Sequence, residues 1–199
     1  MVYKKVKKNQ IKKTSINYEL IKRSKIFSNS RFNIFSDRLL MNNGQHINDH
    51  IIIKPKVTTE ENIVGINILP VFEDKFYLMK VWRHHFNDYI LQSPTGFIEL
   101  NENPRIAALR ELSEETSFKC VEKDLVSMGS FVPDAGLIEG KVALFLALNC
   151  FESRKTQLDE IGTGELVGFN KNEFISILQS ESNIGGSTIA AGLRSLKYL

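Results

Sequence analysis

The distribution of hydrophobic and polar residues predicts a mixture of strands and helices. Over most of the chain, short apolar runs of strand length lie between turn residues, and a few longer stretches have a helical spacing. Strands are predicted in this way at 62–69, 75–83, 86–92, 125–131, 141–150 and 165–169. Helices are predicted at 104–117, 172–179 and 187–198. This order of elements indicates an α+β fold.

Individual features refine this pattern. The strand at 62–69 is expected to stop at Pro70, because proline removes a ladder hydrogen bond. The strand at 141–150 is apolar throughout and is long enough to be buried on both faces. Phe97 and Phe131 are expected in the core.

The N-terminal part has a pattern of its own. Apolar residues between positions 26 and 35 lie close to alternation around a polar turn, and Asn42-Asn43-Gly44 is a second turn signal before the apolar run 51–53. We therefore expect a small antiparallel β unit over 14–58 and a main domain over 59–199. The apolar faces of the unit need cover, either from the main domain or from a second subunit.

The stretch 104–117 has the clearest helical signals. Asn103 is a good N-cap, and Pro104 is favoured at the first helical position because its missing N–H costs nothing there. The helical period of about 100° per residue predicts one face that packs on the core. The residues of that face are Ile106, Leu109, Leu112 and Thr116.

The opposite face of this helix is acidic. Glu111, Glu114 and Glu115 fall within about 100° of one another, and Glu102 lies in the loop before the helix. Like charges at these spacings destabilise a helix by a few tenths of a kcal/mol per pair. A hard divalent ion such as Mg²⁺ takes oxygen ligands and keeps waters and substrate phosphates as its other ligands. The cluster therefore indicates a metal site, entered through the loop that contains Gly96.

Length and composition are those of an ordinary soluble domain. The chain has 199 residues, of which 42% are hydrophobic and 25% charged. No apolar run approaches the length of a transmembrane helix, and no secretory signal is recognisable. The two cysteines, Cys120 and Cys150, imply no disulfide and suit a reducing compartment. We therefore expect a cytoplasmic protein with no membrane partner.

The net charge of +3 depends on the first residues alone. Residues 1–13 contain six lysines and no acid, so the rest of the chain carries −3. Such a tail can attract nucleic acid or anionic surfaces. We interpret it as a basic, flexible, solvated terminus and do not expect a nucleic-acid partner.

The spacing around the acidic helix resembles the signature of the Nudix hydrolases, G-x5-E-x7-R-E-U-x-E-E-x-G-U, in which U is a bulky aliphatic residue. Gly96, Glu102 and the run from Arg110 to Thr116 match it. Ser117 replaces the second glycine, and Phe118 is an aromatic version of the last position. Five charged positions and a glycine at fixed spacing are specific. The resemblance implies an α/β/α sandwich that hydrolyses a nucleoside diphosphate linked to another moiety.

Looser similarities point to the ADP-ribose pyrophosphatase branch of that family. They are Val81-Trp82-Arg83, the Pro94-Thr95-Gly96 entry, Pro133 at 16 positions after Ser117, and the tail 184–191. The N-terminal strands are also similar, and in that branch they help to form a homodimer with shared active sites. The resemblance covers about residues 20–199.

For the metal site, the resemblance implies Mg²⁺ or Mn²⁺. Glu111 and Glu115 are the first-choice ligands, Glu114 is next, and Glu102 acts as a ligand or through a water. The backbone carbonyl near Gly96 also contributes in this branch. Arg110 is expected to hold a glutamate in one orientation rather than to touch the substrate.

The resemblance leaves the general base open. The branch often places a glutamate on the loop after Pro133, but Gly140 occupies that position here, with Glu139 one residue before it. Glu139 is therefore a candidate, and a glutamate of the helix or a metal-bound hydroxide is the alternative. The carboxylates of Asp159, Glu160 and Glu165 are better interpreted as surface groups.

For the substrate, the resemblance points to Arg83, Trp82 and Pro133. Arg83 corresponds to an arginine that meets phosphate or base in this branch, although a surface arginine at a strand end would look the same. Trp82 could stack on adenine or be a core or interface residue. His84 and His85 are adjacent, so in a strand they would point to opposite faces and form a poor metal site.

The expected function is Mg²⁺-dependent hydrolysis of a nucleotide sugar, with ADP-ribose split into AMP and ribose 5-phosphate. One alternative is another Nudix substrate, such as GDP-mannose, a dinucleotide or an oxidised nucleotide. A non-catalytic Nudix module that binds nucleotide or RNA is a further alternative, which the intact glutamates disfavour.

Overall fold

The computed structural model describes residues 17–153 and 164–198. The chain divides into two compact units, Met1–Lys54 and Pro55–Leu199. The basic segment 1–13 and the carboxylates of Asp159 and Glu160 lie outside the described residues. No helix in the described part of the chain has the length and apolar character needed to span a membrane.

The first unit contains a three-stranded sheet in the order β1-β2-β3. Its strands are β1 (Tyr18–Ser28), β2 (Phe32–Met41) and β3 (His46–Pro55). Strands β1 and β2 are antiparallel, and across them Arg23 forms a bidentate pair with the buried carboxylate of Asp37, with both N···O distances at 2.8 Å. The small antiparallel N-terminal sheet predicted from the sequence is confirmed.

The second unit is built on a mixed sheet with the strand order β12-β5-β4-β10-β9. Strand β10 runs parallel to β4 and antiparallel to β9, while β6 pairs with β5 and β7 pairs with β4. The strands are β4 (Ile63–Phe72), β5 (Lys75–Arg83), β6 (Asp88–Gln92), β7 (Thr95–Phe97), β9 (Leu125–Phe131), β10 (Lys141–Ala147) and β12 (Glu165–Phe169). Strands β8 (Phe118–Lys119) and β11 (Phe151–Glu152) form a separate short pair.

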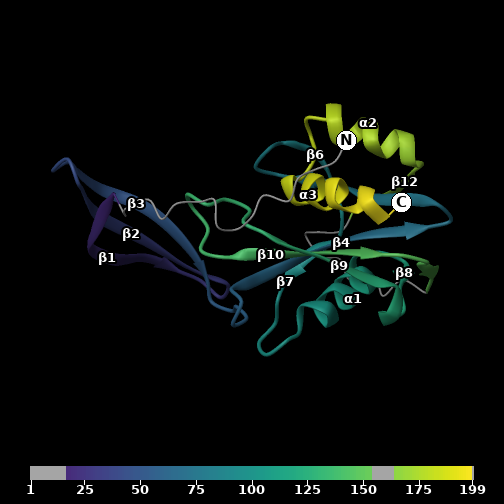
Figure 1. Cartoon of the computed structure of the whole chain (residues 1–199), viewed down its shortest axis with the longest axis horizontal. Coiled ribbons are helices and arrows are strands. Elements are labelled where there is room, and N and C mark those ends of the chain that lie inside the picture. Colours follow the sequence, from purple (N-terminus) through teal and green to yellow (C-terminus); the bar gives the residue numbers. More distant parts are fainter. Residues whose placement is uncertain (1–16, 154–163, 199) are drawn as a thin grey trace. The chain divides into compact units, whose positions relative to one another are not determined.

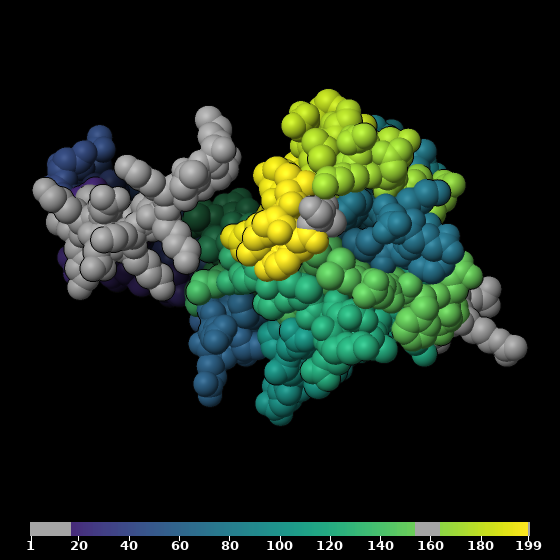
Figure 2. Space-filling model, turned by 45° about the vertical axis from the view of Figure 1, so that its right-hand side comes forward, coloured from purple at the N-terminus to yellow at the C-terminus, as the bar shows by residue number. Residues whose placement is uncertain are grey.

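Helices cover both faces of this sheet. Helix α1 (Pro104–Glu115) packs on one face, against β4, β7 and β10, and helices α2 (Lys171–Ser180) and α3 (Gly186–Ser195) lie on the other face (Figure 1). Helices α2 and α3 lie side by side on the surface (Figure 2). The three-layer sandwich expected from the resemblance is confirmed. Single 3₁₀ turns occur at Glu122–Asp124 and Leu196–Tyr198.

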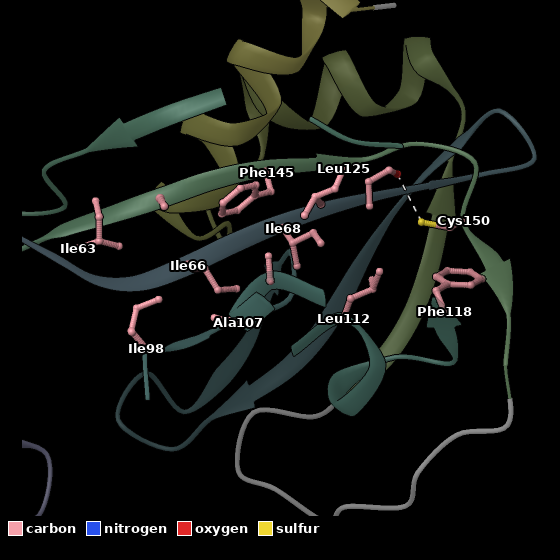
Figure 3. Packing of buried hydrophobic residues seen from close by; sticks show 13 residues of the cluster. Ile63, Ile66, Ile68, Ile98, Ala107, Leu112, Phe118, Leu125, Phe145 and Cys150 are labelled. Carbon is pink, nitrogen blue, oxygen red and sulfur yellow. Dashed lines mark hydrogen bonds between the residues drawn. The ribbon is translucent and has the colours of Figure 1, made fainter. Parts of the chain in front are cut away.

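The sheet separates two hydrophobic clusters. Strand β10 alternates between them: Ala143 and Phe145 pack on the side of α1, and Leu144 and Leu146 pack on the side of α2 and α3. Figure 3 shows the cluster beneath α1, in which Ile66 and Ile68 of β4 meet the helix. Because β10 is buried on both faces, its nearly continuous apolar sequence is explained.

Three details differ from the sequence prediction. Strand β4 continues past Pro70, because the next two residues form a hairpin with β5. Strand β10 ends at Ala147 rather than at 150. Phe97 is 39% exposed instead of buried, since it lies on the short strand β7 at the surface of the site. Phe131 packs against the cluster beneath α3, as expected.

The orientation of α1 also differs from the prediction. Leu112 and Thr116 are buried and Leu109 packs against the core, as predicted, but Ile106 is 62% exposed. The buried residues of the helix are Ala107, Ala108, Glu111, Leu112 and Glu115. The two alanines let the helix approach the sheet closely, and the helix is therefore rotated so that two of its glutamates face inward. The sequence pattern placed all the glutamates of the helix on the face opposite the core, whereas two of them are buried.

We predict that Leu112→Ala and Ile106→Ala have very different effects, although the sequence pattern placed both residues on the core face. Leu112→Ala removes a fully buried side chain and should lower the free energy of unfolding by about 2–5 kcal/mol. Ile106→Ala changes an exposed side chain and should cost less than about 1 kcal/mol. Urea denaturation of both variants measures the difference, and equal losses would contradict the rotated helix.

Candidate active site

Helix α1, which carries the acidic residues, is capped at both ends. The Asn103 side chain accepts a hydrogen bond from the backbone N–H of Arg105 at 2.8 Å, with Pro104 at the first helical position. At the other end, the Thr116 hydroxyl donates to the Leu112 carbonyl and accepts from the backbone N–H of Phe118. The predicted helix and its N-cap are confirmed.

The serine at the family's second glycine position is accommodated by this C-terminal cap. Thr116 has an extended backbone, and Ser117 is not among the described residues with positive φ. A glycine is required where φ is positive, which is not the case here. The Ser117 substitution therefore strains nothing at the end of the helix.

One arginine connects three of the glutamates. The Arg110 guanidinium donates to both carboxylate oxygens of Glu102, at 2.8 and 2.9 Å. It also donates to Glu111 at 2.7 Å and to Glu114 at 2.9 Å. A fourth contact, at 3.2 Å, reaches the backbone carbonyl of Phe97. The hydrogen bonds to the glutamates raise the pKa of Arg110, and the bond to Glu102 contributes most. The side chain is therefore always charged.

Glu111 lies directly against the backbone of Gly96. A Cβ atom added to Gly96 would clash with the carboxylate of Glu111, so any side chain there would displace this carboxylate from its place. The glycine of the signature is thus required by a close approach of backbone to carboxylate. Gly96 itself is held in place by the pairing of β7 with β4, opposite Ile66.

Glu115 is the second inward-facing carboxylate. Its Oε2 accepts a hydrogen bond from the backbone N–H of Thr95 at 2.8 Å, and the Thr95 hydroxyl donates to the Ile66 carbonyl at 2.7 Å. Both Glu111 and Glu115 are buried. The loop that enters β7 and the last turn of α1 are therefore joined by polar contacts at the edge of the core.

A buried polar network fixes this loop from the other face of the sheet. Asn67 of β4 accepts a hydrogen bond from the Ser93 hydroxyl at 2.8 Å and donates to the Ser187 hydroxyl at 3.2 Å. The backbone N–H of Ser93 donates to the Thr188 hydroxyl at 2.9 Å. Helix α3 is in this way linked to the residues just before Thr95.

The donor set fits a hard divalent ion. Four glutamates and one arginine leave three negative charges around Gly96, and all side-chain ligands available there are oxygens. Within 17–153 and 164–198, no group of three or more His, Cys, Asp or Glu side chains stands ready to hold a metal. The buried pair Glu111 and Glu115 is the part of the cluster that could bind an ion together with waters and phosphate oxygens.

The residues expected at the substrate belong to other elements than α1. Arg83 ends β5 and donates to Oε1 of Gln92 at 2.6 Å, and Gln92 begins the segment that leads to Thr95. Trp82 is exposed and meets the Tyr89 ring edge-on at a centroid distance of 5.2 Å. It is therefore not a core residue of the described chain. Pro133 is exposed on the loop between β9 and β10.

The candidate base Glu139 lies half-buried on that same loop. Its neighbour Gly140, at the position where the branch often has a glutamate, is buried. A Cβ atom at Gly140 would lie 2.5 Å from Cγ1 of Val64, so no glutamate fits there with Val64 in place. Glu165 is exposed on β12, opposite Lys80 of β5, as expected of a surface carboxylate.

A cavity of about 580 Å³ opens at the N-terminal end of α1. It lies over β9 and β10, and Glu102 is the member of the acidic cluster that lines it; neither Glu111 nor Glu115 does. The cavity therefore lies beside the acidic cluster rather than over it.

Comparison with known proteins agrees with this geometry. The NUDIX domain profile matches residues 61–170, which is more than half of the chain. The chain belongs to the Nudix family. The matched segment contains the whole acidic cluster and the strand β4 on which the loop before α1 is built.

Two relatives match this Nudix chain over most of its length, and a third matches about one third of it. A methanol dehydrogenase activator of Bacillus methanolicus is 25% identical over 172 residues, 86% of this chain and 88% of that protein. An ADP-ribose pyrophosphatase of Bacillus subtilis (strain 168) is 25% identical over 180 residues, 89% and 91% of the two chains. An ADP-sugar pyrophosphatase of Mus musculus is 38% identical over 71 residues, 32% of this chain and 33% of that one.

The fold itself has a counterpart among solved structures. The crystal structure of an ADP compounds hydrolase superposes with a TM-score of 0.76, covering 94% of this chain and 97% of the other at 19% identity. Together with the family match, these relatives confirm the resemblance to the ADP-ribose pyrophosphatase-like branch of the Nudix hydrolases.

Some contacts of the site could not be predicted from the sequence. The donor to Glu115 is a backbone N–H, that of Thr95, and every residue except proline has such a group. The partner of Arg83 is Gln92, which lies on the neighbouring strand. In the sequence, the spacing of Arg83 and Gln92 becomes informative only once the hairpin of β5 and β6 is known.

We predict that Glu102 stabilises the fold only above acidic pH. Hydrogen bonds from Arg110 lower the pKa of Glu102, so its folded pKa lies below the unfolded value of about 4.3. Its stabilising contribution is then fully present above the unfolded pKa and is lost as the pH falls through the folded pKa. Glu102→Gln should therefore lower the free energy of unfolding at pH 7 and have a much smaller effect near pH 3.

Urea denaturation at several pH values measures this difference. Glu60→Gln is the matched control, because Glu60 is exposed and the same change there should have little effect at any pH. A loss of stability in Glu102→Gln that is the same at pH 7 and pH 3 would contradict the assignment.

Proposed function

We propose that this protein hydrolyses a nucleoside diphosphate linked to a sugar, with ADP-ribose as the first substrate, split into AMP and ribose 5-phosphate. The observation that carries the proposal is the buried pair Glu111 and Glu115, held against the backbone of Gly96 and Thr95. Burying two carboxylates at a helix–loop junction is unfavourable unless a positive charge or several donors satisfy them. A divalent ion bound beneath a diphosphate would supply such a positive charge.

Glu111 and Glu115 would hold the ion, with Glu114, Glu102 and the backbone carbonyl of Gly96 as further ligands. Mg²⁺ is our first choice and Mn²⁺ the second. When bound, such an ion neutralises phosphate oxygens and lowers the pKa of the attacking water. Nudix hydrolases generally use divalent metal ions.

Arg110 acts as a positioning residue in this proposal. Its hydrogen bonds to three glutamates hold the carboxylates in one arrangement before substrate arrives, which is the role of an outer-shell partner. Because its guanidinium is occupied by the glutamates, it is not the group that meets the substrate.

Substrate contacts are assigned to Arg83, Trp82 and Pro133. The Arg83 guanidinium has a neutral partner, Gln92, so its positive charge is available to a phosphate group. The exposed ring of Trp82 could stack on a nucleotide base. Glu139 is the candidate that accepts a proton from the attacking water, and a glutamate of α1 is the alternative.

The relatives favour this substrate class over the other Nudix substrates. Two of them are named for pyrophosphatase activity on ADP-ribose or ADP-sugars. The Bacillus methanolicus relative matches at the same identity and is named as an activator of another enzyme, so similarity alone leaves that second role open. The complete acidic cluster favours hydrolysis, because a binding module has no need for carboxylates that destabilise its helix.

We predict that the protein releases AMP from ADP-ribose in the presence of Mg²⁺ and that Glu115→Gln lowers turnover at least about a hundredfold. Glutamine can still accept the hydrogen bond from Thr95, so the variant should fold. The loss of one negative charge at the metal is then the cause. Product detection with a panel of ADP-ribose, GDP-mannose, dinucleotides and oxidised nucleotides identifies the preferred substrate.

Glu99→Gln is the matched control, because Glu99 is exposed in the same loop region and its hydrogen bond to Glu102 comes from the backbone N–H, which the substitution keeps. It should keep wild-type turnover. Failure to release AMP from ADP-ribose would refute the substrate, and wild-type turnover in Glu115→Gln would refute the metal assignment.

We also propose that the protein is a homodimer formed through its N-terminal unit, in a cytoplasmic location suited to its two free thiols. The unit exposes an unusual number of large apolar side chains for so small a sheet. They are Tyr18, Leu20, Ile21, Ile26, Phe27 and Ile47.

Analytical ultracentrifugation tests the dimer. The wild-type protein should sediment at twice the mass of the chain, 22.7 kDa. Phe27→Asp should shift it toward the monomer, whereas Lys22→Asp, at an exposed polar position of the same strand, should not. A monomeric wild type would contradict the proposal.

A further inference from the structure

The two cysteines of the chain face each other in a short antiparallel pair of strands. In the pairing of β8 with β11, Lys119 lies opposite Phe151, and Phe118 lies opposite Glu152. Continuing this register by one residue places Cys120 opposite Cys150. These are the only cysteines in the sequence, and no step of the proposed hydrolysis uses them.

The hydrogen bonds define the type of pair that the cysteines form. The backbone N–H of Ser153 donates to the Ser117 carbonyl at 2.7 Å, so these two residues form a hydrogen-bonded pair. Such pairs alternate with non-hydrogen-bonded pairs, and three steps further Cys120 and Cys150 occupy a non-hydrogen-bonded one. In agreement, the N–H of Cys150 donates away from this ladder, to the Val71 carbonyl at 3.0 Å. Cα atoms in such pairs are about 4.5 Å apart, within the range that a disulfide bridges.

The two thiols also converge. The Cys120 thiol donates to the Leu148 carbonyl at 3.4 Å, and the Cys150 thiol donates to the neighbouring Ala147 carbonyl at 3.4 Å. The nearby Cys150 thiol lowers the pKa of Cys120, and the nearby Cys120 thiol together with burial raises the pKa of Cys150. Both sulfur atoms therefore lie within reach of each other.

The two thiols differ in access to solvent. Cys150 is buried at the end of the cluster beneath α1, near Phe118, as Figure 3 shows. Cys120 is only partly buried. An oxidant therefore reaches Cys120 first, and its lowered pKa makes it the better nucleophile.

We propose that Cys120 and Cys150 form a reversible intramolecular disulfide when the protein meets a low-molecular-weight disulfide such as oxidised glutathione. The Cys120 thiolate attacks one sulfur of the reagent and displaces one glutathione thiolate. The Cys150 thiolate then attacks the Cys120 sulfur and displaces the second glutathione. Two protein thiols are oxidised, one reagent disulfide is reduced, and the two protons pass to the departing thiolates.

The disulfide would staple the exit of the acidic helix. Cys120 lies five residues after Glu115, and Cys150 follows the inner strand β10. The closed loop of about 30 residues restricts the unfolded chain, which is the main source of stabilisation by a disulfide in the chain-entropy account. Because the two residues already face each other, oxidation should lock the folded structure without rearranging it.

The test equilibrates the full-length protein with oxidised and reduced glutathione at a series of ratios. Intact mass and thiol labelling after denaturation give the product, and thermal unfolding gives its stability. We expect the mass to fall by two hydrogens, both thiols to disappear together, and the melting temperature to rise by about 5 °C or more. Dithiothreitol should reverse all three changes.

Cys150→Ala keeps Cys120 but has no second thiol, so it should take up one glutathione and show no rise in melting temperature. The wild-type measurements decide the proposal even if this variant folds poorly. Wild-type protein that carries bound glutathione, forms disulfide-linked dimers, or keeps both thiols at the most oxidising ratio would overturn it.

Discussion

The rest of the site depends on the hydrogen bonds between the Arg110 guanidinium and the glutamates around it. Its donors reach Glu102, Glu111 and Glu114, and a fourth contact reaches the carbonyl of Phe97 on β7. One side chain thus joins the loop before α1, one turn of the helix and the adjacent strand. Because four carboxylates meet one guanidinium, the cluster keeps a net negative charge.

Close backbone packing makes this arrangement possible. Gly65 of β4 leaves room for β7, since a Cβ atom there would lie 2.9 Å from the carbonyl oxygen of Gly96. Gly96 in turn leaves room for the carboxylate of Glu111. Two glycines, one behind the other, therefore bring a buried strand, a loop and an acidic helix closer than side chains would allow. The alanines of α1 serve the same close approach on the helix side.

The opposite face of the sheet supports the same loop. Asn67, Ser93 and Thr188 form a fully buried network between β4, the loop before β7 and the start of α3. Buried polar groups that are satisfied in this way specify one arrangement, because any shift leaves a donor or acceptor unpaired. The position of Thr95, and with it the contact to Glu115, is therefore fixed from both layers of helices.

From the sequence alone, local chemistry determined most of the fold and the identity of the acidic residues. The caps at Asn103 and Pro104, the strand at 75–83 and the spacing from Gly96 to Glu115 depend on neighbouring residues, and all were predictable. Only the tertiary structure decided which way α1 faces, that Phe97 is exposed, that Gly140 has no room for a glutamate, and that Cys120 meets Cys150. Each of these depends on which segments, far apart in the chain, come to lie against one another, and periodicity along a single segment holds no information about its neighbours.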